Sequence, residues 1–246
     1  MGSGSEEQGS ELPLSAISLE AEFASFVAAP TFPCLGAKAA FNAGSYLVSV
    51  YDQLASDRSS QALASGLEDF TRSEIRRTNE YATFVAIFRQ PRSLGEEDFE
   101  RLLWLQLQKL HQIDAKRYAW DPSVASDPAD QHFSFSFASE ALYVVGMHAN
   151  SSRISRRFPW PALIFNPHEQ FERLRSEGKW RRMQAAIRAR DFGLQGSVNP
   201  MLSDFGEESE AWQYSGRLVD KHWHAPFRTL QAGEGTETAL RCPFAH

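Results

Sequence analysis

The stretch HFSFSFASEALYVVGMHANSSRISRRFPWPALIF, residues 132–165, decides the fold. Its first part, residues 132–137, alternates apolar and polar side chains with the period of a half-buried strand. Two short apolar runs follow at residues 142–148 and 162–166. The connections between these segments are too short for the helical crossovers that parallel neighbours require. The stretch therefore predicts an antiparallel sheet.

Patterns typical of helices surround this sheet. They occupy residues 19–29, 61–70, 96–120 and 180–192. The alanine-rich residues 35–55 predict one long helix, and Pro167 begins a further helix. Residues 81–89 are β-branched and aromatic and predict another strand, whereas the glycines of residues 193–217 predict ordered turns. Together these patterns predict an α+β fold, a single domain in which helices cover an antiparallel sheet.

The composition indicates one domain with short flanking segments. The chain has 246 residues, and its 42% hydrophobic content is enough for a sizeable core. Residues 1–17 begin with a run rich in Gly, Ser and Glu and predict a disordered segment. We expect the domain to span residues 18–228 and residues 229–246 to form a flexible tail.

Charge and cysteine content exclude several classes of protein. A net charge of −6 gives no electrostatic footprint for nucleic acid. No apolar run approaches the ~20 residues that a membrane span needs, and the N-terminus lacks the apolar segment of a signal peptide. Two cysteines are too few for a disulfide framework. We therefore expect a cytoplasmic protein that binds neither nucleic acid nor membranes.

Three side chains could bind a metal. His148 ends an apolar strand, and His168 begins a helix whose positive end favours a neutral ring. Cys34 precedes a helix whose N–H groups would stabilise a thiolate. Each also has a structural interpretation, as a histidine bonded to a backbone carbonyl, a capping histidine and an unligated thiol. The residues alone leave both interpretations open.

Four segments resemble the YqcI/YcgG family: FPCLGAKAAF (32–41), SSRISRRFPWPALIFNPHEQF (151–171), IRARDFGLQGSVNPML (187–202) and GEESEAWQYSGR (206–217). The likeness covers roughly residues 26–227. That family includes heme proteins that N-hydroxylate guanidino groups, among them the arginine hydroxylase of the D-cycloserine pathway and a guanitoxin-pathway hydroxylase. Two positions depart from its pattern, because Ala149 stands where proline is usual and Ala225 replaces the cysteine of a Trp-x-Cys-Pro-Phe motif.

The resemblance implies heme b as the cofactor. His148 is then the first choice for the axial iron ligand, with His168 and Cys34 as alternatives. Residues 34–37 also resemble the ligand loop of thiolate heme monooxygenases, and thiolate ligation favours O–O cleavage. Guanidinium forks bind carboxylates, so arginines are expected at the heme propionates, although a solvated surface position is the alternative. The expected cofactor-binding residues are Arg153, Arg156, Arg157, Ser152 and His168.

The resemblance also implies a cationic substrate, which needs fixed carboxylates. An acidic cluster lies in the last of the four segments, where the alternative is a helix N-terminus that simply favours acids. The expected substrate-binding residues are Glu207, Glu208, Glu210, Gln213 and Tyr214. The expected catalytic residues are Glu207, Glu210 and Asn199.

Three functions compete at this point. The first is a biosynthetic N-hydroxylase that uses heme, O₂ and an external electron donor to oxidise an arginine-like guanidino or amino compound, as a monomer or a homodimer. The second is a heme-binding sensor or carrier without oxygenase activity. The third is a non-heme iron protein, in which His148, His168 and a nearby glutamate would supply the three ligands.

Overall fold

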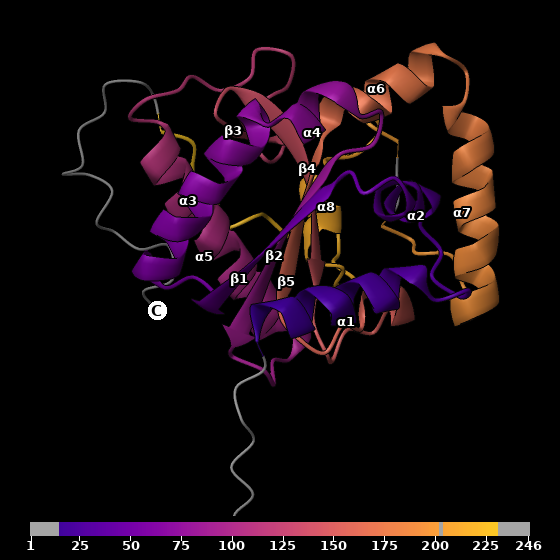
Figure 1. The fold of residues 1–246 in the computed structure, drawn as a ribbon. Helices are drawn as coiled ribbons and strands as arrows, with labels where there is room; N and C mark the ends of the chain where they lie inside the picture. Colours follow the sequence, from indigo (N-terminus) through magenta and orange to yellow (C-terminus); the bar gives the residue numbers. More distant parts are fainter. Residues whose placement is uncertain (1–14, 202–203, 231–246) are drawn as a thin grey trace, which may run out of the picture.

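The computed structural model describes residues 15–201 and 204–230 (Figure 1). In this part of the chain a central sheet contains the strands β1 (Tyr46–Gln53), β2 (Thr83–Gln90), β3 (Phe135–Phe137), β4 (Glu140–Met147) and β5 (Ala162–Pro167). The strand order is β1-β2-β5-β4-β3. β1 and β2 are parallel, and the other neighbours are antiparallel. The prediction of a single α+β domain with a mainly antiparallel sheet is confirmed.

Helices cover both faces of the sheet. On one face lie α3 (Asp57–Arg72) and α5 (Glu96–Asp114), and on the other lie α1 (Ala16–Ala28), α2 (Leu35–Asn42) and α7 (Trp180–Gln195) (Figure 1). The shorter helices are α4 (Glu74–Thr78), η1 (Ile154–Arg156), α6 (His168–Ser176) and α8 (Ala211–Tyr214). None of the helices within residues 15–201 and 204–230 is long and apolar enough to span a membrane.

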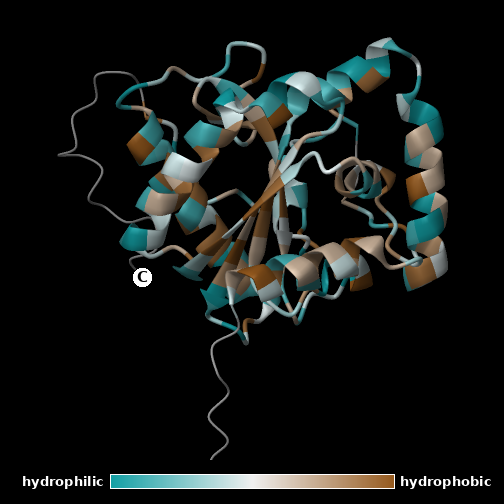
Figure 2. Ribbon diagram, in the orientation of Figure 1, coloured by the Kyte–Doolittle hydropathy of each residue, from teal (hydrophilic) through white to brown (hydrophobic). Residues whose placement is uncertain are grey.

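The alternation of side chains along the strands produces two apolar clusters. On β2, Phe84 and Phe88 pack with α3 and α5, whereas Val85 and Ile87 pack with α1. Figure 2 shows the sheet as mainly hydrophobic and the helices as mixed. Full burial of one large apolar side chain contributes about 1.5–3 kcal/mol to stability. The same alternation decides which strand side chains can reach a site on either face.

The prediction of one helix over residues 35–55 was wrong. α2 ends at Asn42, and β1 begins at Tyr46. Gly44 between them has φ +65°, the left-handed conformation that commonly ends a helix. The residues that follow are aromatic and β-branched, and they pair with the buried strand β2. This misassigned strand supplies the parallel pair that the sequence did not predict.

Other predicted boundaries move by a few residues. The helix predicted over residues 96–120 ends at Asp114, and the strand predicted over 132–137 covers Phe135–Phe137. Residues 16 and 17, predicted to belong to a disordered segment over residues 1–17, lie in α1, which begins at Ala16. Residues 1–14 lie outside the described part. Of the tail predicted over 229–246, the first two residues are placed and residues 231–246 lie outside the described part.

The segment around α8 covers the edge of β4 where the short strand β3 has ended. Gly146 permits this close approach, because a Cβ there would lie 2.7 Å from both Phe99 and Leu103 and 2.9 Å from the carbonyl oxygen of Tyr214. Tyr214 stacks on Trp104 of α5, on one face of the sheet. The segment thereby connects α5 with the opposite face, where the main cavity lies.

α5 carries a buried histidine whose protonation opposes folding. His111 is 4% exposed, and its Nε2 accepts the N–H of Leu230 at 2.9 Å. Burial lowers its pKa from 6.5 to about 4. An unfolded chain gains this proton at higher pH than the folded one. The resulting stability is therefore complete above the unfolded pKa and is lost as the pH falls toward 4.

We expect His111→Gln to remove this pH dependence. Between about pH 7 and about pH 4.5 it amounts to roughly 2 kcal/mol of unfolding free energy, at about 1.4 kcal/mol per pKa unit. Urea unfolding of both proteins at about pH 7 and about pH 4.5 measures it. Burial raises the pKa of Asp114 to about 6, so protonation of Asp114 stabilises the fold as the pH falls through the same range. The effect of His111 is therefore the difference between the pH profiles of the wild type and the variant. Parallel pH profiles would contradict the assignment.

Candidate functional site

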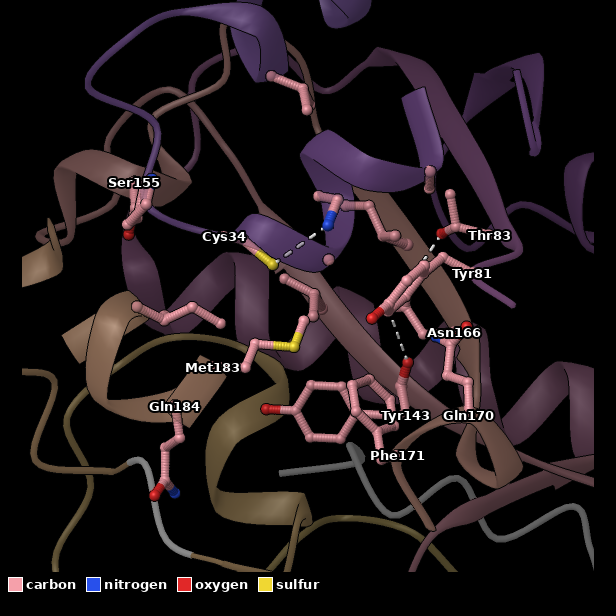
Figure 3. A pocket seen from close by; sticks show the side chains of 18 of the residues that line it. Cys34, Tyr81, Thr83, Tyr143, Ser155, Asn166, Gln170, Phe171, Met183 and Gln184 are labelled. Atoms are coloured by element: carbon pink, nitrogen blue, oxygen red, sulfur yellow. Dashed lines mark hydrogen bonds between the residues drawn. The ribbon is translucent and has the colours of Figure 1, made fainter. Parts of the chain in front are cut away.

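A cavity of about 260 Å³ lies between the sheet and helices α2, α6 and α7. The sheet contributes alternate residues of β4, namely Tyr143, Val145 and Met147, together with Ile164 and Asn166 of β5. Figure 3 shows side chains from α2, the strands, α6 and α7 around one space. Its walls are mainly apolar or aromatic with a few polar groups, as is typical of ligand sites.

The inner face of α7 lines this cavity instead of packing on the core. The residues that face it follow helical spacing: Trp180, Met183, Gln184, Ile187, Arg188 and Asp191. Within the helix, Asp191 alone is buried. A partly apolar helix face with so little burial against protein leaves space in which a bound molecule could complete its packing.

Cys34 is the N-cap of α2 and lines the cavity. Its Sγ accepts the backbone N–H of Ala37 at 3.5 Å (Figure 3). Burial raises the pKa of the Cys34 thiol, and the N–H groups of Ala37 and Gly36 oppose this shift. The thiol is therefore neutral in the structure, but it is positioned where backbone dipoles would support a metal-bound thiolate.

Arg156 places a buried positive charge on the cavity wall. It is 7% exposed, and its Nη1 donates to the carbonyl oxygens of Gly146 (3.3 Å) and Tyr214 (3.0 Å). It forms no ion pair with a carboxylate in the described chain, and burial lowers its pKa. Gly216 has φ +82°, and a Cβ there would lie 2.6 Å from Arg156 Cδ. A buried guanidinium without a carboxylate partner would be stabilised by an anionic group of a ligand.

The other predicted heme arginines have partners elsewhere. Arg153 pairs with Asp191 at 2.5 Å, and Asp191 also accepts the backbone N–H of Asn199 at 3.2 Å. Arg157 is exposed and donates to the carbonyl oxygen of Ser151 at 2.6 Å. Exposed Ser152 bonds to Glu96 through both its N–H and its hydroxyl. Of this group, Asp191 and Asn199 line the cavity.

Glu210 is the acidic residue of the predicted cluster that reaches the cavity. It is 5% exposed, and its Oε1 lies 3.4 Å from Nδ1 of His168. Gln213 also lines the cavity and accepts the hydroxyl of Tyr143 at 2.7 Å. Burial raises the pKa of Tyr143; Arg156 opposes that shift, whereas Glu210 and Cys34 add to it. Tyr143 therefore lies near Arg156, Glu210 and Cys34, three of the ionisable groups that line the cavity.

The remaining acidic residues lie elsewhere. Glu207 and Glu208 are exposed and line a separate shallow depression with His132 and Trp212. Glu207 accepts the backbone N–H of Asp204 at 3.1 Å, a local contact. Tyr214 is fully buried behind Glu210 and does not line the cavity.

His148, the first choice for an iron ligand, lies on the other side of the sheet. It follows the even-numbered residues of β4, which pack toward α5, and its ring stacks on Phe99 at 4.4 Å. Burial lowers its pKa. The period of two along a strand therefore separates it from Tyr143, Val145 and Met147 on the cavity face.

The structure also bears on the non-heme alternative. No three His, Cys, Asp or Glu side chains of residues 15–201 and 204–230 are grouped so that they could hold a metal ion. The structure brings Cys34, Arg156, Asn199, Glu210 and Gln213 to one cavity. It does not bring His148, Ser152, Arg157, Glu207 or Glu208 there.

The sequence analysis missed several residues of the cavity. These are Tyr143, Asn166, Gln170, Met183, Gln184 and Asp191. The helical spacing of Trp180, Met183 and Ile187 could have indicated that this helix lines a cavity. A helix face that packs on the core has the same spacing, so the pattern does not distinguish the two.

Fold and site together define a single-domain α+β protein with a mainly apolar cavity on one face of its sheet. The chain belongs to the YqcI/YcgG family, whose sequence model matches residues 23–228. The resemblance predicted from the four sequence segments is thus confirmed.

Two relatives come from Bacillus subtilis (strain 168). The uncharacterized protein YcgG is 28% identical over 193 residues, which covers 75% of this chain and 75% of that protein. The uncharacterized protein YqcI is 28% identical over 184 residues, which covers 72% and 71%. No solved structure is significantly similar.

Proposed function

We propose that the protein is a heme-dependent N-hydroxylase that uses O₂ to oxidise a guanidino or amino compound within the main cavity. The observation that carries the proposal is that Cys34, Arg156 and Glu210 line one mainly apolar cavity. A thiol, a buried guanidinium and a buried carboxylate suit an iron ligand, a propionate partner and a partner for a cationic substrate, in that order.

Cys34 is the residue that we propose would hold the heme iron, in place of His148. It lies at the start of a helix, where N–H groups oppose the cost of a negative sulfur. Bound heme would supply O₂ activation with electrons from an external donor, and a thiolate ligand favours O–O cleavage. Arg156 would hold a propionate, because a buried guanidinium needs an anionic partner.

The cavity of about 260 Å³ is smaller than a porphyrin and its substrate require, since ligand sites measure roughly 300–1,000 Å³. We therefore propose that α7 moves outward on binding. Within that helix Asp191 alone is buried, and its ion pair with Arg153 would have to break or move with the helix.

Glu210 would bind the cationic end of the substrate, with Gln213 and Asn199 on the same wall. In a site from which water is excluded, a fixed carboxylate both selects a cation and orients it. A heme-binding sensor or carrier is the second candidate. It is favoured by the position of Glu207 and Glu208, because the cavity then has one carboxylate from the predicted cluster instead of three.

Visible spectra of protein produced with ample heme test the proposal. We expect a Soret band in the wild type, a ferrous–CO band position typical of thiolate ligation, and loss of both in Cys34→Ala. His148→Ala and Cys242→Ser, which removes the other cysteine, serve as matched controls that keep the wild-type spectrum. A normal spectrum in Cys34→Ala and its loss in His168→Ala or His148→Ala would contradict the ligand assignment. With a reductant present, no hydroxylated product from any guanidino or amino compound would favour the carrier.

A further inference from the structure

A buried histidine joins the cavity to the protein surface. His168 is 3% exposed and lies at the start of α6, behind Glu210 as seen from the cavity. Its Nδ1 is 3.4 Å from Oε1 of Glu210, and its Nε2 is 3.2 Å from Oε1 of Glu172. Glu210 lines the cavity, whereas the side chain of Glu172 is 49% exposed. The imidazole therefore lies between two carboxylates, one that lines the cavity and one that is partly exposed to solvent.

Neither ring nitrogen makes an aligned hydrogen bond. Both distances are within ion-pair range, yet Nδ1 and Nε2 are buried without a hydrogen-bond partner. Buried polar atoms are nearly always paired, and an unpaired one costs about 1–3 kcal/mol. Catalytic hydrogen bonds are often long in a ligand-free site and tighten when the site is filled.

We infer that Glu172, His168 and Glu210 form a proton path between solvent and the cavity, an inference that rests on the proposed function. Replacing an N–H by N–OH with O₂ releases one water and takes up two electrons and two protons. The external donor supplies the electrons. An imidazole passes a proton by gaining it at Nε2 and losing it at Nδ1.

The surroundings of the three residues suit this path. The ring of Phe205 meets the imidazole edge-on, with centroids 4.4 Å apart, and also lines the cavity. Arg175 pairs with Glu172 at the outer end. At the inner end, the hydroxyl of Tyr214 lies 3.4 Å from Oε2 of Glu210. Glu210 thus has one oxygen toward His168 and one toward the Tyr214 hydroxyl, which donates a hydrogen bond to it.

Nitrogen NMR of the His168 ring in heme-free protein tests the contacts without any turnover. Glu210→Gln is expected to shift the Nδ1 resonance, and Glu172→Gln the Nε2 resonance. Glu169→Gln is the matched control, because Glu169 is next to His168 in α6 but pairs with Arg76 at the surface. An unchanged ring in either test variant overturns the path.

Turnover of the heme-loaded protein tests its use. We expect His168→Gln to lower the rate of formation, and so the yield, of hydroxylated product by roughly 10²-fold, the usual scale of a positioned proton donor, and to change the solvent isotope effect. Added imidazole should restore the yield of His168→Gly, which a purely structural role does not predict. Normal yield in His168→Gln overturns the path and leaves the proposed function intact. No turnover by the wild type overturns both.

Discussion

Glu210→Gln is expected to weaken the binding of a guanidinium or ammonium ligand by about 2–5 kcal/mol, because it leaves a desolvated cation without its partner. That loss corresponds to roughly 30-fold to several thousandfold in affinity. Glutamine has nearly the same size, and Glu210 is 5% exposed, so the change removes charge more than shape. Titration calorimetry on heme-loaded protein with a panel of guanidino and amino compounds measures it.

Two neighbours in the same segment provide the controls. Glu207→Gln and Glu208→Gln remove exposed carboxylates that lie outside the cavity. We expect each to change affinity by no more than about twofold, as is usual for exposed charges. The Soret band should be intact in all three variants. Full affinity in Glu210→Gln and a large loss in Glu207→Gln would move the substrate site to the surface depression.

Glu100→Ala is expected to lower the free energy of unfolding by about 3 kcal/mol, the lower end of the range for breaking a buried ion pair. Glu100 of α5 is 6% exposed and accepts four donors from the chain after α8. They are Ser215 Oγ (3.0 Å), Arg217 Nε (3.1 Å), Arg217 Nη2 (2.7 Å) and Trp223 Nε1 (3.0 Å). The side chain of Arg217 is 22% exposed, so water partly replaces its lost partner.

The matched control is Glu97→Ala, one turn earlier in α5. The side chain of Glu97 is 89% exposed and lies 3.8 Å from Nη1 of Arg217. We expect a change within about 0.5 kcal/mol, because exposed pairs contribute little. Urea unfolding measures both variants. Equal effects of the two would show that Glu100 does not anchor the C-terminal segment.

Local patterns predicted most of the elements. The segment of residues 132–165 indicated antiparallel strands, and β4 and β5 pair in that way. The error at β1 has a simple cause. Alanines favour a helix through residue 42. The local sequence does not indicate that residues 46–53 will pair with a parallel strand that begins at Thr83, 37 positions after Tyr46.

The candidate site was predicted less well. The family resemblance implied roles for Cys34, Arg156 and Glu210, which do line the cavity. It gave His148 as the first choice for the iron ligand and also included Glu207. From sequence alone, a buried histidine that stacks on Phe99 cannot be distinguished from an iron ligand, nor an exposed glutamate from a substrate carboxylate. Spacing along the chain does not say which face of a sheet a side chain will meet.

The sequence by itself determined the α+β class, the family and some of the polar groups from which a site could be made, since periodicity and motifs are local properties. The tertiary structure alone decided which groups share the cavity. The period of two along β4 directs Tyr143 toward it and His148 away, and the packing of α8 over Gly146 brings Glu210 and Gln213 to its wall. That choice depends on contacts between distant segments, which no stretch of sequence contains.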